Sequence, residues 1–371
     1  MAVAALLLLT IIGLIALWPS PQPRRGATEA FGGKSVGATV TASTEVRCPG
    51  PTAQRCRRIT IEVAHGGTST ITLGPSNIAP RVEHGAHIRV VRTKAPPGSG
   101  AEPYSFVDYD RHGSLLWLAI AFGVLAVLLA RWRGLLALVG VVLSLLLVTK
   151  FIVPAILAGS SPLLVSLVGS LAVMFLTLAL TNGVGAQSLA AALGIGVSLL
   201  LATVLADVYA DVANLNGYSS DLATVLRQFT TRVSLEGVVV AGMVVGALGV
   251  LADMGVSQAS AVMALRRANP SLSPRQLYSE AFAVGRDHLA ATIHTLVLAY
   301  VGASLPLLLV LQSAHAGFFD AVNTQDVAEP IIATLVGSIG LIAAVPLTTG
   351  LAALLVARVP AEALPHEHHA H

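Results

Sequence analysis

Several ionisable side chains lie beside apolar segments that are long enough to cross a membrane. Arg286, Asp287 and His288 directly precede an apolar run, His294 lies about two turns inside it, and Asp253 ends the run before it. The hydrocarbon interior solvates charge poorly, so ionisable groups within it are rare and commonly mark ion or substrate pathways. These residues, together with Thr295, are the candidate site for a transported cation or proton.

Simpler interpretations of the same residues remain open. Asp287 is favoured at the positive end of the helix that follows it, and Arg286 can extend its charged end to the membrane surface. A neutral His294 that hydrogen-bonds a neighbouring helix would satisfy its ring without any transport. The sequence is therefore compatible with both a functional and a structural role for these residues.

The helix after residue 287 has one face of small and polar residues. At 100° per residue, an arc of about 80° contains His288, Thr292, Thr295, Ala299, Gly302 and Pro306. Small residues allow helices to approach closely. This face is therefore expected to pack against protein, and the Leu, Val and Ile side chains are expected to face lipid.

The composition indicates a polytopic helical membrane protein. Hydrophobic residues make up 54% and charged residues 11% of the chain, and the mean hydropathy is +0.77; soluble domains carry about 25% charged residues. A membrane helix needs roughly 17–25 apolar residues. Eight candidate runs occur, at 2–18, 114–130, 134–153, 163–180, 188–206, 237–252, 289–311 and 331–357.

The segment between the sixth and seventh runs is expected to form two amphipathic helices. VSQASAVMAL precedes Arg266 and Arg267, and Ser273, Pro274 and Gln276 have the spacing of a capping box that starts a new helix. The two helices would bring Asp253 and Asp287 to one membrane face. Residues 242–246, GMVVG, form a G-x-x-x-G face suited to close helix packing.

A β-rich domain is expected between the first two spans. Short runs such as RITIEV and HIRVV alternate apolar and polar residues and are separated by Gly, Pro and Asn. A small barrel of the OB kind or a sandwich fits this length. Cys48 and Cys56 flank CPGPTAQRC, and a structural disulfide is favoured over a metal or redox pair, because the spacing is not CxxC and no His cluster is near.

The expected domains are an N-terminal anchor at 1–19, an extracytoplasmic β-rich domain at 20–112, a multi-span domain at 113–357 and a His-rich tail at 358–371. The first run has no preceding Lys or Arg, which favours an uncleaved anchor over a signal peptide. Short arginine-rich loops stay in the cytoplasm. With eight crossings, one side of the membrane contains Arg131 and Arg133, the loop 253–288 and Arg358. This side is expected to be the cytoplasm, and both termini lie on it.

The stretch from LGVLADMGVSQASAVMAL to GRDHLAATIHTLVLAYVGASLPLLL resembles the signature region of the YibE/F-like family of bacterial membrane proteins. The resemblance rests on Asp253, Asn269–Pro270, Gly285–Arg286–Asp287, Thr295–Leu296 and Gly302. It implies a multi-pass protein of the bacterial cytoplasmic membrane, sometimes described as permease-like, whose reaction is not established. Family members usually have Asn where this chain has His294, which shifts weight from that residue to Asp253 and Asp287.

Two functions are compatible with the sequence. The first is a transporter or permease-like protein with an acidic site at the cytoplasmic ends of spans six and seven; the second is a scaffold for cell-envelope assembly whose β-rich domain binds a partner. HExxH and a nucleotide-binding fold are absent from the sequence, so neither an enzyme nor a cofactor is expected. The net charge of +3 requires no nucleic acid, and a homo-oligomer is compatible with the GMVVG face.

The tail is the remaining group of possible ligands. Dense imidazoles bind Zn, Ni or Cu weakly, and the tail contains His366, His368, His369 and His371. Without a rigid scaffold, accidental chelation is favoured over a functional metal sensor.

Overall fold

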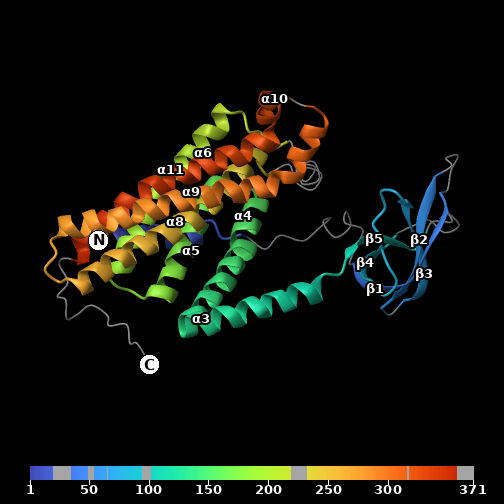
Figure 1. Ribbon diagram of the computed structural model, residues 1–371, viewed down its shortest axis with the longest axis horizontal. Coiled ribbons are helices and arrows are strands. Elements are labelled where there is room, and N and C mark those ends of the chain that lie inside the picture. The colour runs from blue at the N-terminus through green and yellow to red at the C-terminus, as the bar shows by residue number, and fades with distance from the viewer. Residues whose placement is uncertain are drawn as a thin grey trace. The chain divides into compact units, whose positions relative to one another are not determined.

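The computed structural model describes residues 1–19, 35–48, 54–64, 66–93, 102–218, 232–315 and 317–356. The chain divides into two compact units (Figure 1). The helical unit contains Met1–Pro21 and Val127–His371, and the β unit contains Gln22–Ala126. The first helix thus belongs with the later helices, and the β unit extends beyond residue 112.

The β unit is built on one antiparallel sheet. Its strands are β1 (Val36–Arg47), β2 (Arg55–Val63), β3 (Gly67–Pro75), β4 (His87–Arg92) and β5 (Tyr104–Tyr109), in the order β3-β2-β1-β4-β5. The alternation predicted for β2 is present, because Ile59, Ile61 and Val63 are buried and Glu62 is exposed. These side chains join Val40, Ile88 and Val90 in the core.

The two edge strands of this sheet are held near each other. The Glu102 carboxylate, just before β5, accepts hydrogen bonds from the backbone N–H and the hydroxyl of Thr72 on β3, both at 2.7 Å. The sheet therefore curls into a half-barrel, which corresponds to the OB-like alternative rather than to a sandwich of two sheets. A disulfide joins Cys48 to Cys56, the pair singled out in the sequence.

The helical unit follows a simple chain order. It contains α1 (Ala2–Ala16), the later part of α3 (His112–Leu147), a π-helical turn η1 (Val148–Ile152), α4 (Val153–Leu157), α5 (Pro162–Asn182), α6 (Ala186–Val212), α8 (Leu235–Ala268), α9 (Pro274–Ser313), α10 (Phe318–Asn323) and α11 (Gln325–Val356). Figure 1 shows α8, α9 and α11 running alongside one another.

Six helical stretches among the described residues are long and apolar enough to cross a membrane, rather than the eight predicted. The runs 114–130 and 134–153 lie in one stretch, His112–Leu157, and α1 has 15 residues. Within α3, Arg131 has φ 51° and ψ −130°, so the helix is interrupted between these two runs.

The core of the helical unit lies where α6, α8 and α11 meet. Gly340 of α11 illustrates the close packing: a Cβ at this position would lie 3.3 Å from Ala202 Cβ on α6 and 3.5 Å from Leu251 on α8. Large buried side chains of this core include Ile195, Leu199, Met254 and Leu341. The three helices form the frame against which α9 packs.

Candidate functional site

Asp253 lies in the middle of a continuous helix. α8 begins at Ser234, whose side chain accepts a hydrogen bond from Gly237 N at 3.1 Å, and it runs without interruption to Ala268. The separate amphipathic helix predicted after Asp253 is therefore wrong. Its polar residues continue α8 because Gln258 and Ser260 find partners on other helices.

The GRDH motif also lies within a helix rather than at its start. The capping box predicted at Ser273 and Gln276 is confirmed, and it starts a helix that continues for 40 residues to Ser313. Arg286, Asp287 and His288 thus lie more than three turns inside α9. The second amphipathic helix is therefore not separate from the seventh apolar run, because both lie in α9.

Gly285 allows α9 to approach a buried amide of α8. A Cβ at this position would lie 2.5 Å from Gln258 Nε2 and 2.6 Å from its Oε1. Gln258 is 2% exposed, and its Oε1 accepts a hydrogen bond from the Thr349 hydroxyl of α11 at 2.8 Å. The glycine of the GRDH motif therefore supports a polar contact that joins three helices.

One turn from this contact, α8 and α9 bring an acid and an imidazole together. His288 Nε2 lies 3.8 Å from Asp253 Oδ2, and the two side chains are 47% and 64% exposed, respectively. Beside them, the Thr292 hydroxyl contacts Met254 Sδ at 3.8 Å and donates a hydrogen bond to His288 O at 2.9 Å. The pair is open on the outer side of the two helices.

Asp287 and Arg286 are not part of this pair. Both are exposed, and within the described part of the chain neither forms an ion pair. The sequence placed Asp253 and Asp287 together as the acidic site, whereas the structure pairs Asp253 with His288. One residue along a helix turns a side chain by 100°, which accounts for the difference.

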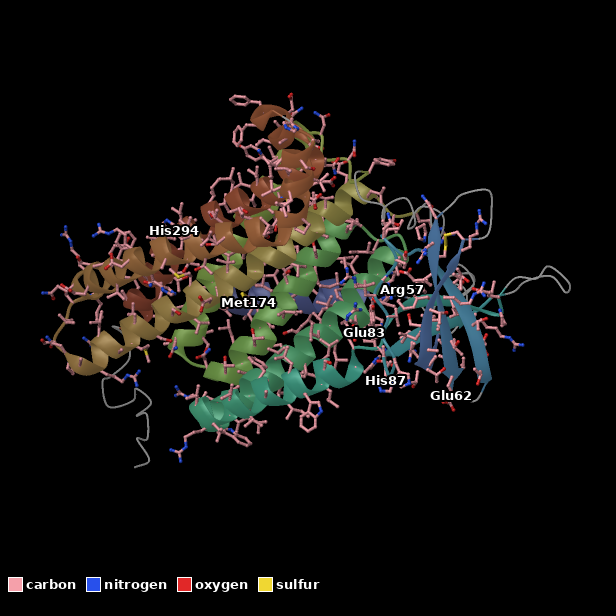
Figure 2. All side chains as sticks on the ribbon, turned by 45° about the vertical axis from the view of Figure 1, so that its right-hand side comes forward. Arg57, Glu62, Glu83, His87, Met174 and His294 are labelled. Atoms are coloured by element: carbon pink, nitrogen blue, oxygen red, sulfur yellow. A yellow bond between two sulfur atoms is a disulfide. The ribbon has the colours of Figure 1, made fainter. Side chains whose placement is uncertain are left out.

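His294 and Thr295 face away from the core. His294 is exposed at the surface of the helical unit (Figure 2), and its Nδ1 lies 2.8 Å from the Ala290 carbonyl of its own helix. Thr295 is exposed and donates to Ala291 O at 3.1 Å. A hydrogen bond from His294 to another helix, one of the two alternatives that the sequence left open, is therefore not made.

The small face of α9 packs against protein only in part: His288 and Thr292 contact Asp253 and Met254 of α8. Leu289 and Ile293 pack against the core, whereas a Cβ at Gly302 would meet nothing within 4 Å. Leu298, Leu305 and Leu309 are exposed, as expected of a side that faces lipid. In the GMVVG face, a Cβ at Gly242 would meet nothing within 4 Å, and a Cβ at Gly246 would lie 3.3 Å from the Tyr300 hydroxyl oxygen.

Comparison with known proteins gives one clear result. The model of the YibE/F-like protein family matches residues 118–358, well over half of the chain. The chain belongs to the YibE/F-like family. No curated protein and no solved structure matches it.

The match places the candidate site inside the shared YibE/F-like region. Asp253 and His288, the Gly285–Gln258 contact and all of α8, α9 and α11 fall within residues 118–358. The five strands of the β unit precede it. The site therefore lies within the region that the chain shares with the family, and the β sheet lies before that region.

A second group of carboxyls lies at the other end of α8. Glu236 lies beside Asp207 and Asp211 of α6, and the pocket there has a volume of about 440 Å³ and is lined also by Arg232 and Ser234. Asp207 and Asp211 both lie in the last two turns of α6. All three carboxyl-bearing residues near the pocket are exposed.

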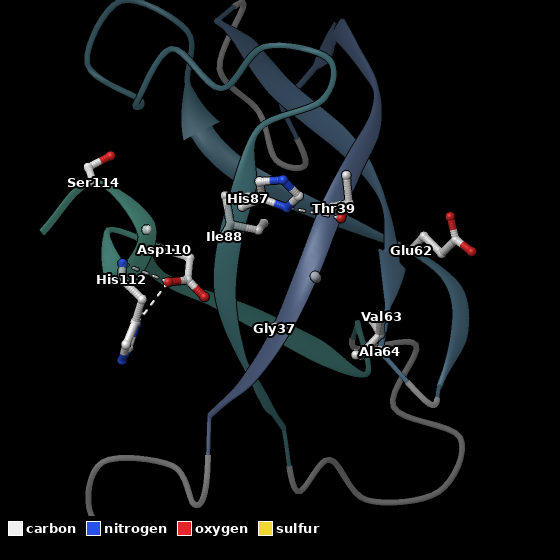
Figure 3. A pocket seen from close by; sticks show the side chains of 12 residues that line it. Gly37, Thr39, Glu62, Val63, Ala64, His87, Ile88, Asp110, His112 and Ser114 are labelled. Atoms are coloured by element: carbon white, nitrogen blue, oxygen red, sulfur yellow. Dashed lines mark hydrogen bonds and ion pairs between the residues drawn. The ribbon is translucent and has the colours of Figure 1, made fainter. Parts of the chain in front are cut away.

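The β unit of this YibE/F-like chain has a larger hollow, of about 820 Å³ (Figure 3). Thr39, Glu62 and His87 are cross-strand neighbours on its wall, and Thr39 Oγ1 lies 3.3 Å from His87 Nδ1. Asp110 lies at the same hollow and bonds His112 Nδ1 at 2.8 Å.

The Asp110 carboxyl is held in its charged form. It accepts hydrogen bonds from the His112 backbone N–H and ring, and these, with the nearby charges of His112 and Arg89, lower the pKa of Asp110 below its ordinary value of 3.8. Arg111 does the same for its neighbour: its side-chain hydrogen bond to Asp108 is the largest cause that lowers the pKa of that carboxyl. These pairs fix the end of β5 to the start of α3.

No group of three metal-ligating side chains comes together within the described ranges. The tail residues His366, His368, His369 and His371 lie outside those ranges. The weak metal site considered for the tail stays a prediction.

Proposed function

We propose that this YibE/F-like protein is a transporter or permease-like protein in which Asp253 and His288 exchange a proton. The observation that supports this is the 3.8 Å pair itself, formed between two of the helices that are apolar enough to cross a membrane. Because ionisable groups on such helices are costly, their pairing favours a function.

The pair can bind and release a proton without leaving two uncompensated charges. With one proton, an imidazolium faces a carboxylate and the helices attract; when the proton leaves, only the carboxylate is charged and the attraction is lost. α8 and α9 are then free to shift relative to each other at this level. That change is the proposed coupling step between proton movement and passage of a substrate.

The proposal also specifies the membrane in which the protein lies and its topology. The protein would lie in the bacterial cytoplasmic membrane with eight crossings and both termini in the cytoplasm. The interruption at Arg131 supports two crossings within His112–Leu157, since 46 residues of helix would be about 69 Å long, against a hydrocarbon thickness of about 30 Å. The arginines 131 and 133 would then occupy the cytoplasmic turn.

The test is proton flux into proteoliposomes under an imposed membrane potential. Asp253→Asn is expected to abolish flux and His288→Gln to reduce it strongly, while Asp320→Asn, an exposed acid on α10, leaves it at the wild-type rate. Wild-type flux in the Asp253 variant, with all proteins equally incorporated, would rule out the role assigned to the pair.

The hollow in the β unit favours a second candidate function. A polar depression of about 820 Å³ is suited to a ligand or to a segment of another envelope protein. In that case the protein would be a non-transporting scaffold, alone or as a homo-oligomer. Purification in mild detergent separates the two: a stoichiometric partner that is lost on Glu62→Arg but retained on Asp253→Asn would favour the scaffold.

A further inference from the structure

The core between α6, α8 and α11 contains a row of polar side chains that the proton pair does not use. Eight buried or nearly buried residues of these helices are polar and none is ionisable: Ser188, Ser198, Thr203, Gln258, Thr334, Ser338, Thr348 and Thr349. Asp253 and His288 lie on the exposed side of α8 and α9, so this row is a separate feature.

Three of the seven hydroxyls in this core, those of Thr203, Thr334 and Thr349, donate to a carbonyl of their own helix. Thr203 donates to Leu199 O at 2.8 Å, and Thr334 donates to Pro330 O at 2.7 Å. Such back-bonding is the usual state of Ser and Thr in membrane helices. These hydroxyls therefore need no further hydrogen-bond partner.

Ser198 and Thr348 depart from this pattern. Both residues are 0% exposed, and within the described part of the chain their hydroxyl oxygens have no hydrogen-bond partner. A buried polar atom without a partner is costly, and such atoms in native structures usually have a bound water or ion. These two hydroxyls therefore point to a ligand.

The two hydroxyls belong to the same helix–helix contact. The Thr348 hydroxyl lies directly against Gly194 of α6, where any Cβ would collide with it. Ser198 is one turn further along the same face of α6, and its carbonyl lies 3.6 Å from a Cβ built on Gly340 of α11. The contact between α6 and α11 thus has an unpartnered hydroxyl on each side.

The row continues from this contact toward one end of the bundle. The Thr349–Gln258 hydrogen bond adjoins Thr348, and beyond it Gln187 Nε2 donates to Ser260 Oγ at 2.6 Å. Six residues of the three helices thus bring hydroxyl and amide groups to this contact and to the hydrogen bonds beside it: Ser198, Thr348, Thr349, Gln258, Ser260 and Gln187. We call these six residues the polar seam; Thr203 and Thr334 are not among them.

We propose that the polar seam is the path of the transported species, closed in this structure where Thr348 meets Gly194, and that the species are water and small monovalent cations. The proposal rests on the transport function proposed above and names its substrate class. Hydroxyl, amide and carbonyl oxygens can replace the water around a monovalent cation. Divalent cations prefer carboxylates, and anions need positive groups, neither of which the seam contains.

Cysteine accessibility tests this directly, because the two cysteines of the sequence are joined in a disulfide and leave no free thiol. Ser198→Cys and Thr348→Cys are prepared in the full chain in membrane vesicles and treated with cationic or anionic methanethiosulfonates of equal size. Thr203→Cys is the matched control, since Thr203 lies on α6, is buried and bonds its own helix. Each variant is first checked for wild-type elution and thermal unfolding.

The expected result is reaction of the thiols at 198 and 348 with the cationic reagent about tenfold faster than the thiol at 203, and faster than with the anionic reagent. Equal rates at all three positions, or equal rates with both reagents, would overturn the proposal. If a cysteine variant fails to fold, a second experiment compares Thr348→Val with Thr334→Val as its control. Replacing N-methylglucamine with Na⁺ is then expected to raise the unfolding temperature of the wild type and of Thr334→Val, but not that of Thr348→Val. Equal increases in the unfolding temperature of all three proteins would overturn the proposal.

The outcome is distinguishable from failure of the proton pair. Asp253→Asn should stop proton flux without changing thiol reactivity at 198 and 348. Reactive seam thiols with unchanged flux in the Asp253 variant would remove the proton pair and keep the seam. Loss of flux with unreactive thiols would keep the pair and remove the seam.

Discussion

At the scale of single residues, Gly285 is the residue of the GRDH motif whose replacement the structure constrains most. Gly285→Ala places a methyl group against the Gln258 amide and forces it away from Thr349. Crowding of this kind costs about 1–3 kcal/mol. The free energy of unfolding in detergent, measured with urea or heat, is expected to fall by that amount.

Gly302→Ala is the matched control on the same helix, because a Cβ there meets nothing within 4 Å. Removing a helical glycine is expected to stabilise by about 0.5–1 kcal/mol. Equal effects of the two substitutions would show that α9 does not pack against Gln258 as described.

The sequence identified Gly285 but not the reason for it. Gln258, which Gly285 contacts, looked like a surface residue of a weakly amphipathic helix. Gln258 accepts its hydrogen bond from Thr349, which is 91 residues away in the sequence. Similarly, Asp253 and His288 were both singled out, but their pairing depends on how α8 and α9 are rotated against each other. Residue type and spacing predict candidates, whereas long-range contacts select among them.

At the scale of elements, the junction between β5 and α3 is expected to depend on pH. The folded-state pKa of Asp110 lies below 3.8 because His112 donates to the carboxylate. A lowered pKa contributes stability that is present above the unfolded value and is lost as pH falls through the folded value. The unfolding temperature of the β unit should therefore decline as pH falls below about 4.

Asp110→Asn should flatten part of this decline, and the exposed Glu83→Gln serves as the control. Thermal unfolding followed by circular dichroism between neutral pH and pH 3 measures the effect. An identical acid decline in wild type and Asp110→Asn would contradict the role given to this carboxyl.

Element boundaries show where local sequence signals were sufficient. The capping box at Ser273 and Gln276 was predicted because all of its atoms lie within four residues. The alternation of β2 was predicted because one face of the sheet is buried. The continuity of α8 beyond Asp253 and of α9 through GRDH was not predicted, because it depends on contacts with neighbouring helices, such as that of Gly285 with Gln258.

At the scale of the whole molecule, the helical unit separates two kinds of chemistry. The outward side of α8 and α9 contains the ionisable pair, and the inner contact of α6, α8 and α11 contains neutral oxygens. Both lie within the YibE/F-like region. The proposed coupling therefore requires that movement of α9 on α8 is transmitted through Gln258, the residue that contacts Gly285 on one side and Thr349 on the other.

The proposed topology makes the last prediction. If His112–Leu157 crosses twice, Trp132 lies in a cytoplasmic turn and Ser161 lies in the next turn on the outer side. Trp132 is 69% exposed, and the Ser161 side chain makes no capping hydrogen bond to α5, so both tolerate cysteine. A membrane-impermeant maleimide should label Ser161→Cys in intact cells, and it should label Trp132→Cys only after the cells are permeabilised. A Trp132 thiol that stays unreactive after permeabilisation would place residue 132 inside the bilayer, which makes this segment a single tilted crossing and moves every later turn to the opposite side.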